Sequence, residues 1–226
     1  MFKSKSRPIV ISQSEHLRLV GAMAMLWGNE NFDVPPVERN SMMAGMALHD
    51  RGYGVLDNSA IGEMAEEEWL QIARRSFSMP GSDIIADTII KYHIRRLASF
   101  PKTVEREALT AEFSQEIDDQ LKSHGLSKEV FDRIDRITEL IDSISFAFCF
   151  DMPGSGEVSI FPRNGEDTEV SVHYHVENGT IHVEPWPFSV SHYDGYIFAY
   201  PLDGYPERLD PFVLSYRLER KQKKDL

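Results

Sequence analysis

Apolar residues recur at helical spacing through the first two thirds of the chain, and this period predicts a series of helices. The first is expected to begin after Ser12, because Ser12 and Glu15 have the S-x-x-E spacing of a capping box. The last has the most continuous apolar face, which includes Ile134, Ile141 and Ile144. The predicted helices cover residues 13–28, 37–50, 65–77, 82–99, 104–123 and 127–149.

The period changes after about residue 150, where apolar and polar residues begin to alternate. In residues 170–176, Val172 and Val176 share one side and His173 and His175 the other, which is typical of a half-buried strand. The dipeptide at 178–179, Asn-Gly, favours a type I′ hairpin turn. The other predicted strands cover residues 181–184, 196–200 and 211–217, and residues 8–12 form either a short strand or an extended lead-in.

These patterns predict a mainly α fold: a helical bundle with a small antiparallel β part at the C-terminal end. We expect a helical domain over residues 1–152 and a β-rich extension over residues 153–226, packed on the helices. An apolar content of 42% and a charged content of 27% are ordinary for a globular protein.

The net charge of the chain limits the classes of partner that it can attract. A net charge of -12 argues against attraction to nucleic acid or to an anionic membrane, so neither partner is expected. No apolar run approaches the length of a membrane helix. The single cysteine, Cys149, excludes an internal disulfide and fits a reducing compartment, so we expect a cytoplasmic protein.

Four residues on these helices have the chemistry of a metal site. His16 lies on the first predicted helix, His49 and Asp50 end the second, and Asp142 lies within the last. Two imidazoles and two carboxylates suit one divalent ion such as Mn²⁺, Fe²⁺, Mg²⁺ or Zn²⁺. Asp142 is the most informative of them, because its helix is apolar enough to be buried and a buried carboxylate needs a cation or strong donors.

A structural interpretation of the same residues stays open. A lone histidine on a helix is usually a satisfied core or surface residue. Histidine is also common at helix C-termini, where it interacts with the negative end of the dipole. In this interpretation the four polar side chains only bond to one another.

The order of these residues resembles the H…HD…D signature of the HD-domain superfamily, in which each element lies on a different helix. The chain also resembles an uncharacterised bacterial family of HD-like proteins. The segments that carry this second resemblance are HLRLVGAMAMLWG (16–28), HDRGYGVLD (49–57), IIKYHIRRL (89–97), LIDSISFAFC (140–149) and VEPWPF (183–188). Known HD-domain enzymes are mostly metal-dependent phosphohydrolases. The resemblance therefore implies hydrolysis of a small phosphorylated molecule, and the alternative is an HD-like module that binds a metal or ligand without catalysis.

Neighbouring residues are candidates for completing such a site. We assign Asp50, His93 and Asp57 to catalysis: His93 as a fifth ligand or a general acid, and Asp57 as a group that orients water or a ligand. Asp57 is equally well explained as a turn-former. Lys91 and Arg95 are four residues apart on one helix face and could hold a phosphate, although a solvated face explains them as well.

The predicted hairpin offers a rival metal site. His173, His175, His182 and Glu184 share its polar side, and facing residues on paired strands are close enough to bind one ion. The arrangement resembles the metal site of cupin-like barrels. Too few strands are predicted to build such a barrel, and an exposed hairpin face often carries mixed polar groups.

Overall fold

The computed structural model describes residues 1–53, 57, 59–81 and 83–221 and combines helices with one large sheet. Helix accounts for 44% and strand for 21% of the chain. Within the described residues, the helices are α1 (Gln13–Leu26), α2 (Arg39–Ala47), α3 (Glu66–Ser78), α4 (Ile84–Ala98), α5 (Val104–His124) and α6 (Lys128–Cys149). The strands are β1 (Phe2–Lys3), β2 (Ile9–Ile11), β3 (Gly154–Ile160), β4 (Val170–Glu177), β5 (Thr180–Glu184), β6 (His192–Pro201) and β7 (Phe212–Arg220).

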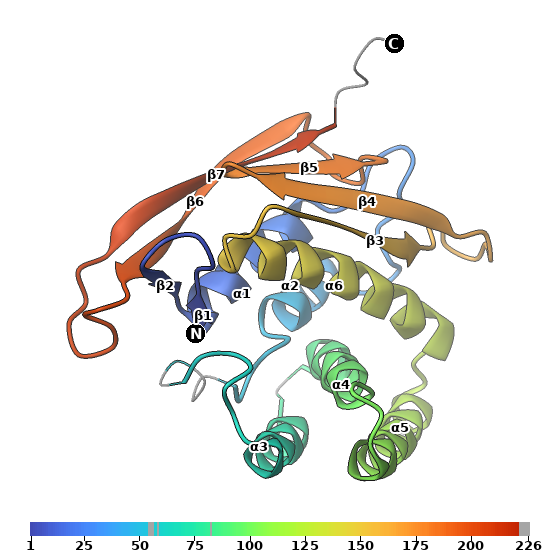
Figure 1. Ribbon diagram of the computed structural model, residues 1–226. Coiled ribbons are helices and arrows are strands. Elements are labelled where there is room, and N and C mark those ends of the chain that lie inside the picture. Colours follow the sequence, from blue (N-terminus) through green and yellow to red (C-terminus); the bar gives the residue numbers. More distant parts are fainter. Residues whose placement is uncertain (54–56, 58, 82, 222–226) are drawn as a thin grey trace.

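The strands form a seven-stranded curled sheet in the order β1-β2-β6-β7-β5-β4-β3. Strands β5 and β7 run parallel, and all other neighbours run antiparallel. One face of the sheet packs on α6 and α1, and the remaining helices lie beyond them (Figure 1). The apolar side chains of this face, including Val172, Ile181, Ile197 and Leu218, are fully buried and join the helical core.

The prediction of a mainly α bundle with a small antiparallel β part is wrong. The fold is α/β, because its sheet is mixed, extends over seven strands and recruits β1 and β2 from the N-terminal end of the chain. Strand β3 was missed because its first half, Gly-Ser-Gly, has low strand propensity. The division at residue 152 stays a prediction.

The six helix predictions are confirmed, with ends that differ by a few residues. The hairpin turn is also confirmed, since Asn178 and Gly179 both have positive φ, at 51° and 77°. The predicted capping box is half formed. Ser12 accepts from the backbone N–H of Glu15, but the carboxylate of Glu15 accepts from the backbone N–H of Phe198 in β6 at 2.8 Å. None of the described helices combines the length and apolarity that a membrane crossing needs.

Candidate metal centre

The predicted ligands come together where three helices meet. His16 lies on α1 and Asp142 on α6, while His49 and Asp50 follow α2, which ends at Ala47. Helix α1 packs against both α2 and α6, so residues far apart in the sequence reach one point. The two imidazoles are fully buried, and the two carboxylates are mostly buried.

The distances that join the two imidazoles to each other and to each carboxylate match the spacing of ligands around one metal ion. Nε2 of His16 lies 3.3 Å from Nε2 of His49 and 3.3 Å from Oδ1 of Asp142. Nε2 of His49 lies 3.4 Å from the same Oδ1, and Oδ2 of Asp50 lies 3.6 Å from both Nε2 atoms. Ligands at about 2.1 Å from an ion lie about 3.0 Å apart in an octahedron and about 3.4 Å apart in a tetrahedron. His16, His49 and Asp142 therefore fit one ion with little movement, while Asp50 belongs to a second group of close donor atoms with His49 and His93.

Hydrogen bonds at Nδ1 hold both imidazole rings with Nε2 directed at the cluster. Nδ1 of His49 lies 2.7 Å from the carbonyl oxygen of Met46, so Nδ1 carries the proton and donates it. The Ser145 hydroxyl donates to the carbonyl of His16 at 3.1 Å, and its oxygen therefore accepts from Nδ1 of His16 at 2.9 Å. Metal-binding histidines usually have tautomers fixed in this way. When both rings are neutral, two Nε2 lone pairs and two carboxylates face one another, and either a metal ion or a proton between them relieves their repulsion.

The pKa values of the cluster also indicate that a positive charge between the carboxylates is favourable. Burial by itself raises the pKa of Asp50, but the imidazoles, that of His49 first, outweigh it and lower the pKa to about 2. Burial likewise opposes ionisation of Asp142, yet His16 and His49 hold its pKa well below the usual value. The pKa of His49 is raised although burial of the ring opposes this, because both carboxylates attract a charge. In the metal-free protein a proton can thus take the place of a metal ion.

His93 of α4 reaches the cluster as a donor to Asp50. Nη2 of Arg96 donates to Nδ1 of His93 at 2.9 Å, so Nε2 carries the imidazole proton and donates to Oδ1 of Asp50 at 2.9 Å. Burial, followed by the nearby His49, lowers the pKa of His93 and keeps the ring neutral. These contacts favour a positioning role for His93, and its roles as fifth ligand or general acid stay predictions.

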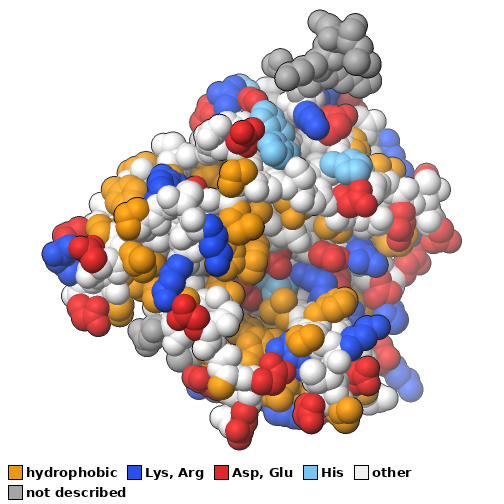
Figure 2. All heavy atoms as spheres, in the orientation of Figure 1, with side chains coloured by type: hydrophobic (Ala, Val, Ile, Leu, Met, Phe, Trp, Pro, Cys, Tyr) orange, Lys and Arg blue, Asp and Glu red, His pale blue; other side chains and the backbone are white. Residues whose placement is uncertain are grey.

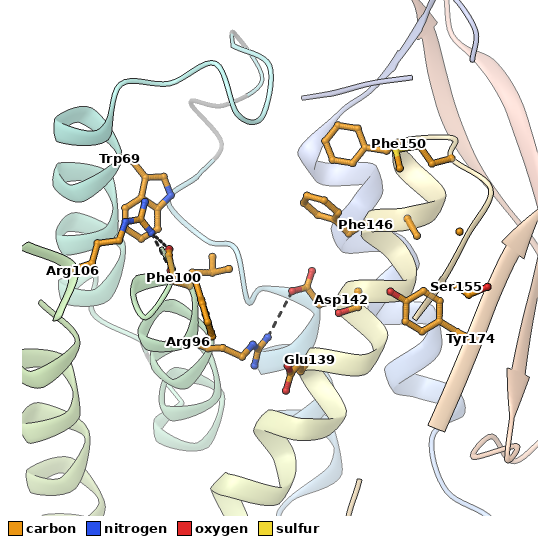
Figure 3. Close-up of a pocket in the computed structure, with 15 residues that line it drawn as sticks. Trp69, Arg96, Phe100, Arg106, Glu139, Asp142, Phe146, Phe150, Ser155 and Tyr174 are labelled. Carbon is orange, nitrogen blue, oxygen red and sulfur yellow. Dashed lines mark hydrogen bonds and ion pairs between the residues drawn. The ribbon is translucent and has the colours of Figure 1, made fainter. Parts of the chain in front are cut away.

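Arg96 is a cation of α4 that points toward the metal centre (Figure 3). Its Nη1 donates to the carboxylate of Asp135 and, at 3.1 Å, to the carbonyl of the same residue, which fixes the guanidinium. Its Nη2 lies 3.6 Å from Oδ2 of Asp142. A held guanidinium beside the ligands can bind an anion that approaches the site.

Lys91 and Arg95, the predicted phosphate ligands, lie elsewhere on α4. Lys91 donates to Oε1 of Gln120 at 2.6 Å, and the Arg95 guanidinium stacks 4.3 Å from the ring centroid of Tyr92. Neither residue lines the cavity that opens at Asp142. Their role in substrate binding stays a prediction that these contacts do not favour.

Asp57 is linked to the site through the start of α1. Its Oδ1 accepts from the backbone N–H of Gln13 at 2.7 Å, which stabilises the N-terminus of the helix that carries His16. The Gln13 side chain in turn donates to Oδ2 of Asp50. The role of Asp57 in orienting water or a ligand stays a prediction.

The structure does not bring the rival hairpin histidines together around one point. His173 pairs with Glu157 at 3.1 Å, while His182 pairs with Glu219 at 3.5 Å. The rings of His175 and His182 are neighbours on paired strands, with centroids 6.4 Å apart. Among the described residues, groups of three close donor atoms occur only around His49.

A cavity of about 600 Å³ opens beside Asp142. It lies between α3 and α4 on one side and α6 and β4 on the other (Figure 3). Figure 2 shows hydrophobic side chains gathered around the hollow between the sheet side of the molecule and the lower helices. The residues that line this cavity include Trp69, Arg96, Phe100, Arg106, Glu139, Asp142, Phe146, Phe150, Met152 and Tyr174.

Sequence reasoning missed three residues that shape the centre. Ser145 follows Asp142 by three residues, and Arg96 follows His93 by three residues, so each lies on the same helix face as a predicted site residue. This spacing could have revealed both. Gln13 carries no comparable signal, because its contact with Asp50 depends on how α1 and the end of α2 meet.

Comparison with known proteins identifies one similar family. A family model described as "Protein of unknown function (DUF3891)" matches residues 86–197. The chain is similar to that family over this span, which begins within α4, ends within β6 and contains His93, Arg96 and Asp142. His16, His49 and Asp50 lie outside it. No curated protein and no solved structure matches the chain.

Replacing His93 by phenylalanine tests its positioning role. An aromatic ring is kept, but Oδ1 of Asp50 loses its donor, so we expect the affinity for Mn²⁺ to fall about 10–100-fold, as for other residues that hold a metal ligand in place. Competition with a metal chelator measures the affinity. His124→Phe, at the exposed end of α5, is the matched control and should leave the affinity unchanged. Equal affinities for the two variants would contradict the role.

Proposed function

We propose that the chain is a metal-dependent phosphohydrolase that uses one divalent ion, Mn²⁺, Fe²⁺, Mg²⁺ or Zn²⁺, on a small phosphorylated molecule. The observation that carries the proposal is the placement of the Nε2 atoms of His16 and His49, which face the carboxylates of Asp142 and Asp50 at ligand spacing. The resemblance to HD-domain proteins stays part of the proposal. Its support is that a histidine, a His-Asp pair and an aspartate from three helices converge at one point.

The roles of the protein groups follow from their contacts. A bound divalent ion would supply a Lewis acid that activates water and stabilises charge on a phosphoryl oxygen. Arg96, held by Asp135, would bind the phosphoryl group electrostatically at the mouth of the centre. His93 would hold the carboxylate of Asp50 in place. The mixed imidazole and carboxylate donor set favours these ions over sulfur-preferring ones.

The alternative is a module that binds a metal or ligand without catalysis. It is favoured by the hydrogen bonds that already engage His93, the predicted general acid, and Glu139, a carboxylate that lines the cavity at Asp142. Glu139 accepts from Arg136 at 2.9 Å, and both ring nitrogens of His93 are hydrogen-bonded. A cytoplasmic location also stays a proposal, and its support is the free, buried thiol of Cys149.

Phosphate release from a panel of phosphate monoesters in Mn²⁺ tests the function. The wild-type protein should hydrolyse at least one of them, and His49→Ala should lower kcat at least about a hundredfold, because the ion supplies several kcal/mol of transition-state stabilisation. His175→Ala, on the sheet, is the control and should keep full activity. A metal-loaded protein that hydrolyses none of the panel would support the non-catalytic alternative.

A further inference from the structure

The cavity beside Asp142 has a charged end and apolar walls. Arg96 and Asp142 point toward one another at the charged end, next to the donor atoms of the metal centre (Figure 3). Phe146 and Phe150 follow Asp142 along α6, and Phe100 comes from the end of α4 on the facing side. A volume of about 600 Å³ is in the range of small-molecule sites.

Three large apolar side chains of the cavity are exposed to water. The exposed fractions are 66% for Phe100, 44% for Phe146 and 43% for Met152. Clustered apolar exposure is a feature of binding sites, since isolated apolar residues are common on surfaces but contiguous patches are not. A ligand with an apolar group would remove this surface from water.

The charged side chains along the walls are already paired within the protein. Arg106 donates to both carboxylate oxygens of Glu66, at 2.5 Å and 2.9 Å. Glu139 accepts from Arg136 at 2.9 Å. A ligand rich in hydroxyl groups would have to compete with these bonds or leave its own groups unpaired against phenylalanine rings, and both alternatives are costly. The walls therefore fit an apolar group better than a sugar.

We infer that the substrate is a phosphate monoester of an apolar alcohol or phenol. This inference rests on the proposed function and specifies its substrate class. The phosphoryl group lies beside Arg96 at the metal centre, and the apolar group lies against Phe100 and Phe146. In the hydrolysis, a water oxygen bonds to phosphorus, the ester P–O bond breaks with its electron pair moving to the leaving oxygen, and that oxygen takes the proton that the attacking water releases. The products are inorganic phosphate and the alcohol.

Binding of two phosphonates to the Mn²⁺-loaded protein tests the substrate class. Phenylphosphonate and methylphosphonate share the anionic group, resist hydrolysis and differ in the apolar group. By titration calorimetry, phenylphosphonate should bind at least about tenfold more tightly, because its ring leaves water for the apolar wall. The metal content of each sample is measured in parallel.

Variants of the cavity wall test whether Phe100 and Phe146 cause the preference for phenylphosphonate. The double variant Phe100→Ala/Phe146→Ala should lower the affinity for phenylphosphonate at least about threefold and leave that for methylphosphonate unchanged. Phe212→Ala, an exposed phenylalanine of β7 outside the cavity, should leave both unchanged. Equal binding of the two phosphonates by metal-loaded protein, or a preference that survives the double variant, overturns the substrate class alone. A wild-type protein that takes up no metal overturns the proposed function and the substrate class with it.

Discussion

Asp142→Ala is expected to leave the protein without a bound divalent ion, whereas the wild-type chain should carry about one ion. The carboxylate of Asp142 lies 3.3 Å from Nε2 of His16 and 3.4 Å from Nε2 of His49, so its loss removes the anion that both imidazoles face. Metal analysis of protein loaded with Mn²⁺ measures the content. A parallel thermal melt should show stabilisation of the wild type by about 2.7 kcal/mol at an ion concentration 100 times Kd, and none of the variant.

The control is Asp132→Ala on the same helix. Asp132 is half-buried and pairs with Lys128 at 2.9 Å, ten residues before Asp142 on α6. The same substitution there should leave both the metal content and the Mn²⁺ stabilisation at wild-type values. If Asp142→Ala retains its ion, Asp142 is not a required ligand. If the wild type takes up no ion under these conditions, the side chains only bond to one another, as in the structural interpretation of the sequence.

The ligands could be predicted because their signal is local. Asp142 interrupts the apolar face of a helix between Ile141 and Ile144, and such a carboxylate is costly to bury unless a cation or donors are nearby. The helical period also places His16 correctly on α1. The details that fix the chemistry are not local. The tautomer of His16 depends on Ser145 of another helix, and the spacing of Ser145 from Asp142 indicates a shared helix face but not the contact with His16.

The number of strands in the sheet was underestimated for a related reason. Strand β3 buries only Val158 and Ile160, and its glycines weaken the strand signal. The N-terminal strand β2 is three residues long, and its pairing with β6 joins opposite ends of the chain. The parallel pairing of β5 with β7 also connects strands that are not consecutive. Patterns along the sequence report alternation within a strand, whereas the number and order of strands depend on partners elsewhere in the chain.

Trp27→Ala is expected to destabilise the sheet and the helices together, by about 3–5 kcal/mol. Trp27 is buried at the end of α1, packs against Phe32 and Phe188 with ring centroids 6.0 Å and 6.1 Å away, and forms a backbone bridge to Phe188. The residues on either side add hydrogen bonds to the segment before β6, from Gly28 to Pro187 and from Ser189 to Leu26.

Chemical denaturation followed by far-UV circular dichroism and tryptophan fluorescence measures this effect. Of the two tryptophans that remain in the variant, Trp69 lies on α3 and Trp186 follows β5, so fluorescence reports on both parts of the molecule. One cooperative transition, shifted to lower denaturant and coincident in both signals, is expected if the parts share one core. Leu209→Ala, an exposed control, should change the free energy of unfolding by less than about 0.5 kcal/mol. Two separated transitions would instead support independent domains divided near residue 152, because a helical domain that folds alone would unfold without the sheet.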